Sequence, residues 1–226
     1  MVMPFPGVSP SMLNAPAETL PKLFGKGNLI RLPTAAGWTE DKDAGSTAQA
    51  VNYLGLSTAA AGNDTSILYA QLLGMVTSAS PMHNFNWDKK LIFSFAIVRD
   101  PTQAGAVTRV QIKKAVTEGI LADDGLGIQV TNFTVIGECF GAAQGTTATI
   151  KTLTAGKKNQ ITIIHYPGVK VEWYVDGVLA ATYSTVANVP NGVVNASYYV
   201  VFSLDNNATA TACSAYILNP WIWQEL

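Results

Sequence analysis

The segment VEWYVDGVLAATY, residues 171–183, alternates apolar and polar positions on both sides of an Asp-Gly pair. Val171, Trp173 and Val175 fall on one face of an extended chain, because successive side chains of a strand point in opposite directions. The Asp-Gly pair can adopt a positive φ at both positions, as a two-residue type I′ turn requires. The pattern therefore predicts an antiparallel β-hairpin.

Short apolar or alternating segments follow one another from residue 27 onward, separated by Gly, Asn, Asp and Thr. Residues 91–100, LIFSFAIVRD, are apolar on both faces, which predicts a central, buried strand. Further strands are predicted at 107–116, 127–140 (one strand or two), 147–153, 159–168, 196–204 and 211–226.

Residues 65–76, TSILYAQLLGMV, fit either a strand or a helix capped by Asp64 or Thr65. Gly74 and the β-rich surroundings favour a strand. About ten to thirteen strands at such spacings predict an all-β fold, a two-sheet antiparallel sandwich.

The first part of the chain has a different character, since six of the eleven prolines fall within residues 1–33. Proline removes backbone donors and interrupts helices, so this part is predicted to be extended. A disordered tail would hold fewer large apolar residues, whereas an arm docked on another surface needs them as anchors. We therefore predict an assembly arm over residues 1–26, ahead of a sandwich over 27–226. Its anchors would be Phe5, Leu13, Leu20, Leu23 and Phe24.

Charged residues make up only 13% of the chain, hydrophobic residues 48%, and the net charge is −1. So little surface charge favours an exterior covered by neighbouring subunits, and hence a homo-oligomer. A neutral surface rich in Thr, Ser, Asn and Gln is the alternative. Scattered basic residues argue against nucleic acid as a partner. No apolar run reaches 18 residues, and no secretory signal pattern opens the chain, so no membrane association is predicted.

Cys139 and Cys213 are the two cysteines, each in an apolar or small-residue strand context. Two reduced, buried thiols and a disulfide between them are both compatible with the sequence.

The order of LIFSFAIVRD, LADDGLGIQV (121–130), the long stretch 152–192 and a Trp-bearing terminal strand resembles the concanavalin A-like, or laminin G-like, jelly-roll sandwich. The most specific part is VEWYVDG followed by Ala181 and then VPNG at 189–192. The resemblance covers residues 45–226. Sandwiches of this kind serve lectins, polysaccharide hydrolases, adhesion modules and coat or tail proteins of viruses and phages, so the resemblance implies a fold rather than one function.

Hydrolases of this superfamily carry E-x-D-x-x-E on one strand, with two glutamates that flank the scissile bond. This chain lacks that spacing, and Glu138 and Glu172 stand alone in predicted strands. His83 and His165 have no second ligand at metal spacing, and His165 is predicted to be a hydrogen-bonded packing residue. We therefore predict no catalytic residues, no enzymatic activity and no cofactor other than calcium.

The resemblance implies a calcium site at the rim of the sandwich, where loop residues rich in oxygen would contribute. Ordinary turn roles for the same residues are the alternative. The candidate ligands are Asp123, Asp124, Asp205 and Asn206.

Sugar binding would need exposed aromatic rings beside amide or carboxylate groups. The candidate platforms are Trp38, Trp87 and Tyr198, with burial in the core as the alternative for each.

Two functions remain. The main hypothesis is a non-enzymatic structural protein of a virus or phage particle, such as a capsid decoration, spike or tail component. It would be located in the virion and would assemble with other virion subunits through its arm and sandwich surface. The alternative is a carbohydrate-binding or adhesion module whose partner is a host glycan.

Overall fold

The computed structural model describes residues 27–30, 32, 38–50, 53–72, 85–99, 105–192, 197–207 and 211–226. The predicted arm over residues 1–26, with Phe5, Leu13, Leu20, Leu23 and Phe24, lies outside the described residues, as does His83.

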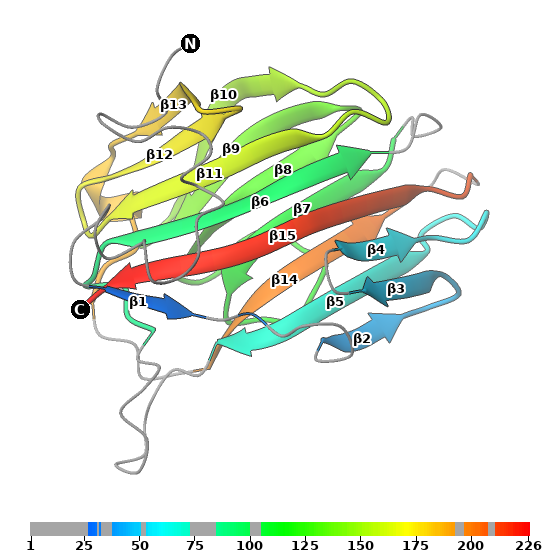
Figure 1. Ribbon diagram of the computed structural model, residues 1–226, viewed down its shortest axis with the longest axis horizontal. Helices are drawn as coiled ribbons and strands as arrows, with labels where there is room; N and C mark the ends of the chain where they lie inside the picture. The colour runs from blue at the N-terminus through cyan, green and yellow to red at the C-terminus, as the bar shows by residue number, and fades with distance from the viewer. Residues whose placement is uncertain are drawn as a thin grey trace.

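Two antiparallel sheets pack face to face, and Figure 1 looks onto one of them with the other behind. The sheet in front has eight strands in the order β13-β12-β11-β6-β15-β4-β3, with β1 paired to β15. Its strands are β1 (Gly27–Ile30), β3 (Ser46–Ala50), β4 (Tyr53–Ser57), β6 (Leu91–Arg99), β11 (Asn159–Tyr166), β12 (Lys170–Val175), β13 (Val178–Tyr183) and β15 (Ser214–Glu225).

The sheet behind has seven strands in the order β10-β9-β8-β7-β14-β5-β2. Its strands are β2 (Thr39–Lys42), β5 (Thr65–Leu72), β7 (Val107–Lys113), β8 (Gly125–Thr131), β9 (Thr134–Phe140), β10 (Gln144–Thr152) and β14 (Tyr198–Asp205). In the described part of the chain the helical content is one short 3₁₀ turn, η2 (Val186–Asn188), and no helix there is long and apolar enough to cross a membrane. The prediction of an all-β, two-sheet sandwich is confirmed.

The predicted hairpin is β12 and β13, with φ of 50° at Asp176 and 82° at Gly177, as a type I′ turn requires. The central strand is β6, which lies between β11 and β15 and buries every residue except Val98. The described part of the ambiguous segment at 65–76 forms β5 (Thr65–Leu72), paired with β14 and β2. Residues 127–140 fall into two strands, β8 and β9.

Trp173 of β12 ties the two sheets together in the core. Its indole Nε1 donates a hydrogen bond to the Gly127 carbonyl oxygen of β8, at 2.9 Å, so the buried donor is satisfied across the sandwich. The ring lies against Gly137 of β9, where a Cβ atom would come within 2.4 Å of the indole. Gly137 is therefore required by the close approach of the two sheets.

Cys139 of β9 and Cys213, which precedes β15, are buried thiols, and no disulfide joins them. Burial raises the pKa of the Cys139 thiol to about 12. The fold therefore contains no covalent link between the sheets at these positions.

Replacing Gly137 by Ala should destabilise the protein by roughly 1–3 kcal/mol, because the added methyl group overpacks the indole of Trp173. The matched control is Gly119→Ala, since the nearest atom to a Cβ there is 3.6 Å away. The control should leave the free energy of unfolding unchanged or slightly raised. Urea denaturation measures both, and equal effects of the two substitutions would contradict the assignment.

Candidate functional site

The register of the seven-stranded sheet determines which side chains meet on its outer face. Alternate residues point away from the core, and the paired residues form rows across the strands. One row contains Glu138, Gly127, Gln111, Val201 and Tyr69, and the next contains Ile136, Gln129, Arg109, Ser203 and Ile67. Lys113 and Tyr199 are paired in the row on the other side. Charged, amide and aromatic groups from five strands thus share one surface.

Gly127 creates the space in which the central polar contact forms. A Cβ atom at this position would lie 2.2 Å from the Val110 carbonyl oxygen and 2.9 Å from Cγ of Gln111, so a larger residue would meet both the backbone of β7 and the amide side chain. Gln111 Nε2 donates a hydrogen bond to Glu138 Oε2 at 2.7 Å, and both side chains are buried. Because Gly127 of β8 has no side chain, Gln111 of β7 reaches across β8 and bonds to Glu138 of β9.

Two cations fasten the segment that connects β7 to β8, residues 114–124, to this face. Lys113 Nζ donates to two of its carbonyl oxygens, at 2.6 and 2.9 Å, and Arg109 Nη1 donates to a third, at 2.7 Å. The three carbonyls belong to Thr117, Gly119 and Glu118, respectively. Arg109 Nε also donates to Gln129 Oε1, at 3.1 Å. These contacts fix the guanidinium and the amide in place before any ligand arrives.

Burial shifts the ionisation of all three charged groups. It raises the pKa of Glu138, and the hydrogen bond from Gln111 and the charges of Arg109 and Lys113 oppose that rise. It lowers the pKa of Lys113 to about 8 and that of Arg109 below its usual value. The cluster holds two basic groups and one acidic group on one face of the sheet.

Tyr69 and Tyr199 form an aromatic pair on the same face, from the neighbouring strands β5 and β14. Their ring centroids are 5.8 Å apart and the planes are at 82°, an edge-on arrangement. Both rings are half-buried, as are Arg109 and Gln129, so each keeps accessible surface. Tyrosine rings, a guanidinium and an amide on a rigid surface are groups that recognise sugars.

The predicted sugar platforms Trp38, Trp87 and Tyr198 lie in the core, with exposures of 4%, 1% and 2%. Trp87 packs edge-on against Tyr198, with centroids 5.6 Å apart. The prediction of stacking on these rings is wrong because they fill the space between the sheets. For Tyr198 the error is one position, since its neighbour Tyr199 points outward. The parity of Val200, Phe202 and Leu204, which are all buried, is the sequence signal that would have separated the two tyrosines.

The four predicted calcium ligands do not come together. Asp205 pairs with Val107 at one end of β7, whereas Asp123 and Asp124 precede β8 near the other end of that strand. Because the two pairs lie at opposite ends of one strand, a site made of all four is wrong. Within the described ranges, no three His, Cys, Asp or Glu residues form a group that would hold a metal ion.

Asn206 has a structural role instead. Its buried amide donates to the Ala59 and Ala61 carbonyls, at 3.0 and 2.6 Å, and its side-chain oxygen accepts from the Asp64 backbone, at 2.8 Å. It therefore ties the loop before β5 to the end of β14.

His165 is a packing residue, as predicted. The ring is fully buried, Nε2 lies 2.7 Å from the Pro190 carbonyl oxygen, and Trp87 packs edge-on against it. Burial lowers its pKa to about 4, so the imidazole is neutral near pH 7.

Comparison with solved structures identifies the fold as a concanavalin A-like jelly roll. An endo-β-1,4-glucuronan lyase from Trichoderma reesei matches with a TM-score of 0.59 and 11% identity, over 87% of this chain and 93% of the lyase. A carbohydrate recognition domain, that of Emp47p, matches with a TM-score of 0.56 and 12% identity, over 89% and 98%. A Bacillus licheniformis β-glucanase matches with a TM-score of 0.55 and 11% identity, over 90% and 99%.

No family model matches the sequence. No curated protein matches it either. The structural neighbours named above include two enzymes and one recognition domain, and none of them supports the predicted role in a virus or phage particle. The fold of this chain is a concanavalin A-like, two-sheet jelly roll.

The buried charge of Lys113 predicts a pH-dependent stability. Between pH 8 and 10.5 the unfolded chain holds the Lys113 proton and the folded chain releases it, so the folded state gains stability as the pH rises. Relative to Lys113→Met, the unmodified protein should gain up to about 1.4 kcal/mol per pH unit in this window. Urea titrations at several pH values measure the difference. For the control Lys114→Met, at the surface of the same segment, the free energy of unfolding should vary with pH as it does in the unmodified protein. The same pH dependence in Lys113→Met would refute the assignment.

Proposed function

We propose that this chain is a carbohydrate-binding module whose ligand lies on the outer face of the seven-stranded sheet. The observation that carries the proposal is the half-buried pair Tyr69 and Tyr199 on the same face as the fixed side chains of Arg109 and Gln129. The structural neighbours support it, since those reported above are named for a carbohydrate recognition domain and two polysaccharide-active enzymes.

The chemistry of the face suits a hydroxyl-rich polymer. A tyrosine ring offers an apolar surface to the C–H face of a sugar, while a guanidinium and an amide donate to its hydroxyl and ring oxygens. Arg109 already donates to Gln129 Oε1 and to the segment 114–124, and Gln129 Nε2 donates to Thr131 Oγ1, so little side-chain freedom is lost on binding. A ligand would meet the accessible parts of Tyr69, Tyr199, Arg109 and Gln129.

We further propose that binding occurs without hydrolysis. Hydrolysis of a glycosidic bond needs two carboxyl groups that flank it, about 5–10 Å apart. Among the described residues, the register places Gly127 and Thr146 directly beside Glu138 and places Ile136 and Phe140 next along its own strand. None of these is a carboxylate, so Glu138 lacks a partner for that chemistry in its immediate surroundings. The virion location and the assembly with particle subunits stay predictions.

Replacing Tyr199 by Ala should weaken polysaccharide binding about tenfold or more, equivalent to about 1.4 kcal/mol, because the stacking surface is lost. Affinity electrophoresis in gels that contain soluble β-glucan or β-1,4-glucuronan measures the retardation. Tyr199→Phe is the matched control, since it retains the ring and should bind nearly as well as the unmodified protein.

The same samples test the absence of turnover. Prolonged incubation with each polysaccharide should release neither reducing ends nor unsaturated products. Free migration of the unmodified protein through both gels, or retardation that Tyr199→Ala leaves unchanged, would show that this face is not the binding surface.

A further inference from the structure

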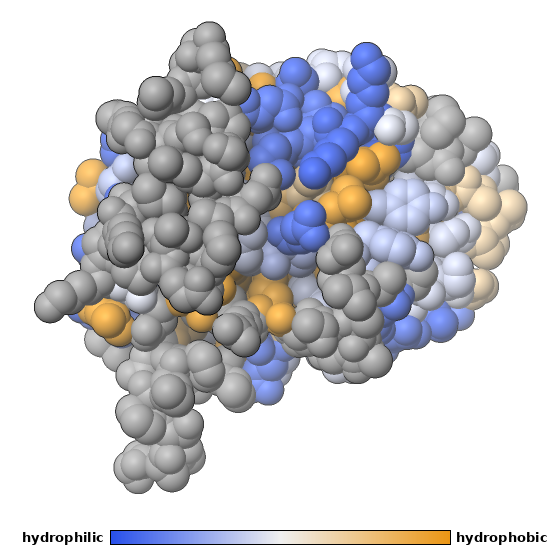
Figure 2. All heavy atoms as spheres, in the orientation of Figure 1, coloured by the Kyte–Doolittle hydropathy of each residue, from blue (hydrophilic) through white to orange (hydrophobic). Residues whose placement is uncertain are grey.

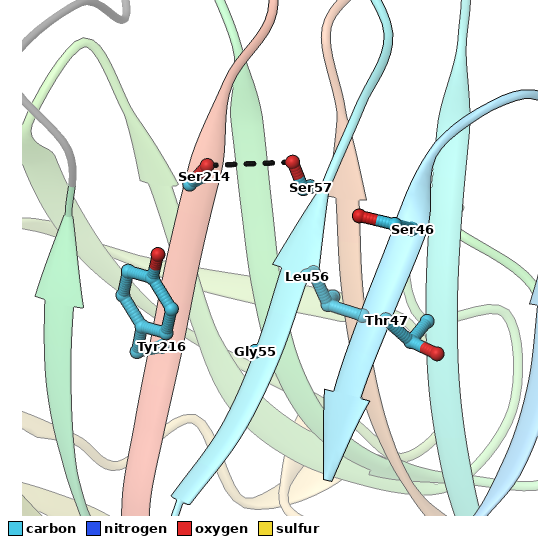
Figure 3. A pocket seen from close by; sticks show the side chains of 7 residues that line it. All are labelled: Ser46, Thr47, Gly55, Leu56, Ser57, Ser214 and Tyr216. Carbon is cyan, nitrogen blue, oxygen red and sulfur yellow. Dashed lines mark hydrogen bonds between the residues drawn. The ribbon is translucent and has the colours of Figure 1, made fainter.

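The opposite outer face of the sandwich contains a hollow at the end formed by β3, β4 and β15 (Figure 3). The register explains its depth. Ser46, Ser57 and Ser214 are paired in one row across the three strands, and Gly55 is paired with Tyr216 in the next. Because most of these side chains are small, they leave a recess of about 180 Å³ beside the tyrosine.

Tyr216 lines this recess and forms an exposed aromatic pair with Tyr53. Their exposures are 38% and 40%, and they are the large aromatic side chains that the fold leaves exposed in the part of the chain that the structure describes. The ring centroids are 6.2 Å apart with planes at 69°. In Figure 3, which looks onto β15, β4 and β3 from outside, the face of the Tyr216 ring is turned toward the viewer. Part of the Tyr216 ring is therefore accessible in the region that the structure describes.

The polar side chains of the hollow are hydroxyl residues, of which Thr47 has its oxygen buried. Ser46, Thr47, Ser57 and Ser214 line it together with Gly55, Leu56 and Tyr216, so no lining residue carries a charge. The hydroxyls of Ser57 and Ser214 lie 3.4 Å apart, and a hydroxyl can both donate and accept. In Figure 2 the area over β4 and the adjoining end of β15 is pale, of intermediate hydropathy, and a hydrophobic patch separates it from strongly hydrophilic residues above. A ligand that carries a charge would find no counter-charge among the lining residues.

We propose that this hollow is a second carbohydrate subsite, specific for a neutral sugar, which stacks on Tyr216 and forms hydrogen bonds with Ser57 and Ser214. It goes beyond the proposed function, because the first site lies on the other sheet and contains Arg109, Lys113 and Glu138. One chain would then hold two saccharide segments, one on each outer face. A polymer that reaches both faces, or two chains that share one polymer, would gain avidity.

The test is a titration with a soluble neutral β-1,4-linked glucose oligosaccharide, followed by NMR of the protein. The unmodified protein should show two groups of shifted resonances, one from each face. Tyr216→Ala should weaken binding at the hollow at least tenfold and leave the resonances of the seven-stranded sheet responsive, whereas Tyr199→Ala should do the reverse. Tyr216→Phe, which retains the ring, should bind as the unmodified protein does. Unchanged thermal unfolding of all variants confirms that the fold persists.

The two proposals fail in different ways. If the hollow resonances do not respond to the neutral oligosaccharide, or respond equally in Tyr216→Ala, the second subsite is refuted, while polysaccharide retention that depends on Tyr199 would still support the first. If the response at the hollow is lost in Tyr216→Ala but retention never depends on Tyr199, the second subsite stands and the first is refuted.

Discussion

The face-to-face packing of two sheets is the constraint on which the rest of this structure depends. It assigns one set of alternate side chains on every strand to the core and leaves the other set for contact with solvent or ligand. Trp173 shows how closely the two layers approach, since its indole reaches a carbonyl of the opposite sheet and leaves no room for a side chain at Gly137. A ligand that binds to the outer face of either sheet must therefore contact the alternate side chains that point away from the core.

On the seven-stranded sheet that remaining set is unusually polar for a surface that is partly covered. Taking charges out of water is costly unless they are paired and hydrogen-bonded. Here Glu138 accepts from Gln111, while Arg109 and Lys113 donate to carbonyls of the segment 114–124. The polar groups therefore form a rigid platform, held by a side-chain contact between β7 and β9 and by the backbone of the segment 114–124.

The strands and the hairpin could be predicted from the sequence, whereas the set of residues that meet on the outer face of the seven-stranded sheet could not. The hairpin at Asp176-Gly177 and the buried strand β6 are local patterns, so they can be derived from residues near one another in the chain. The proposed binding face is not local, because Glu138, Gln111 and Tyr69 become neighbours only through strand register. The choice of Tyr198 over Tyr199 failed for a related reason. A shift of one residue exchanges core for surface, and only the apolar parity of the residues that follow, Val200, Phe202 and Leu204, assigns Tyr198 to the core and Tyr199 to the outer face.

The two thiols have a practical consequence for the chemistry of the whole chain. Cys139 and Cys213 are both shielded from reagents, and the high pKa of Cys139 keeps its sulfur protonated and unreactive. Since no cross-link joins them, reductants have nothing to break and mild oxidants have no accessible thiolate to attack. The architecture is thus indifferent to redox potential, and alkylation of either sulfur would report that the sandwich has opened.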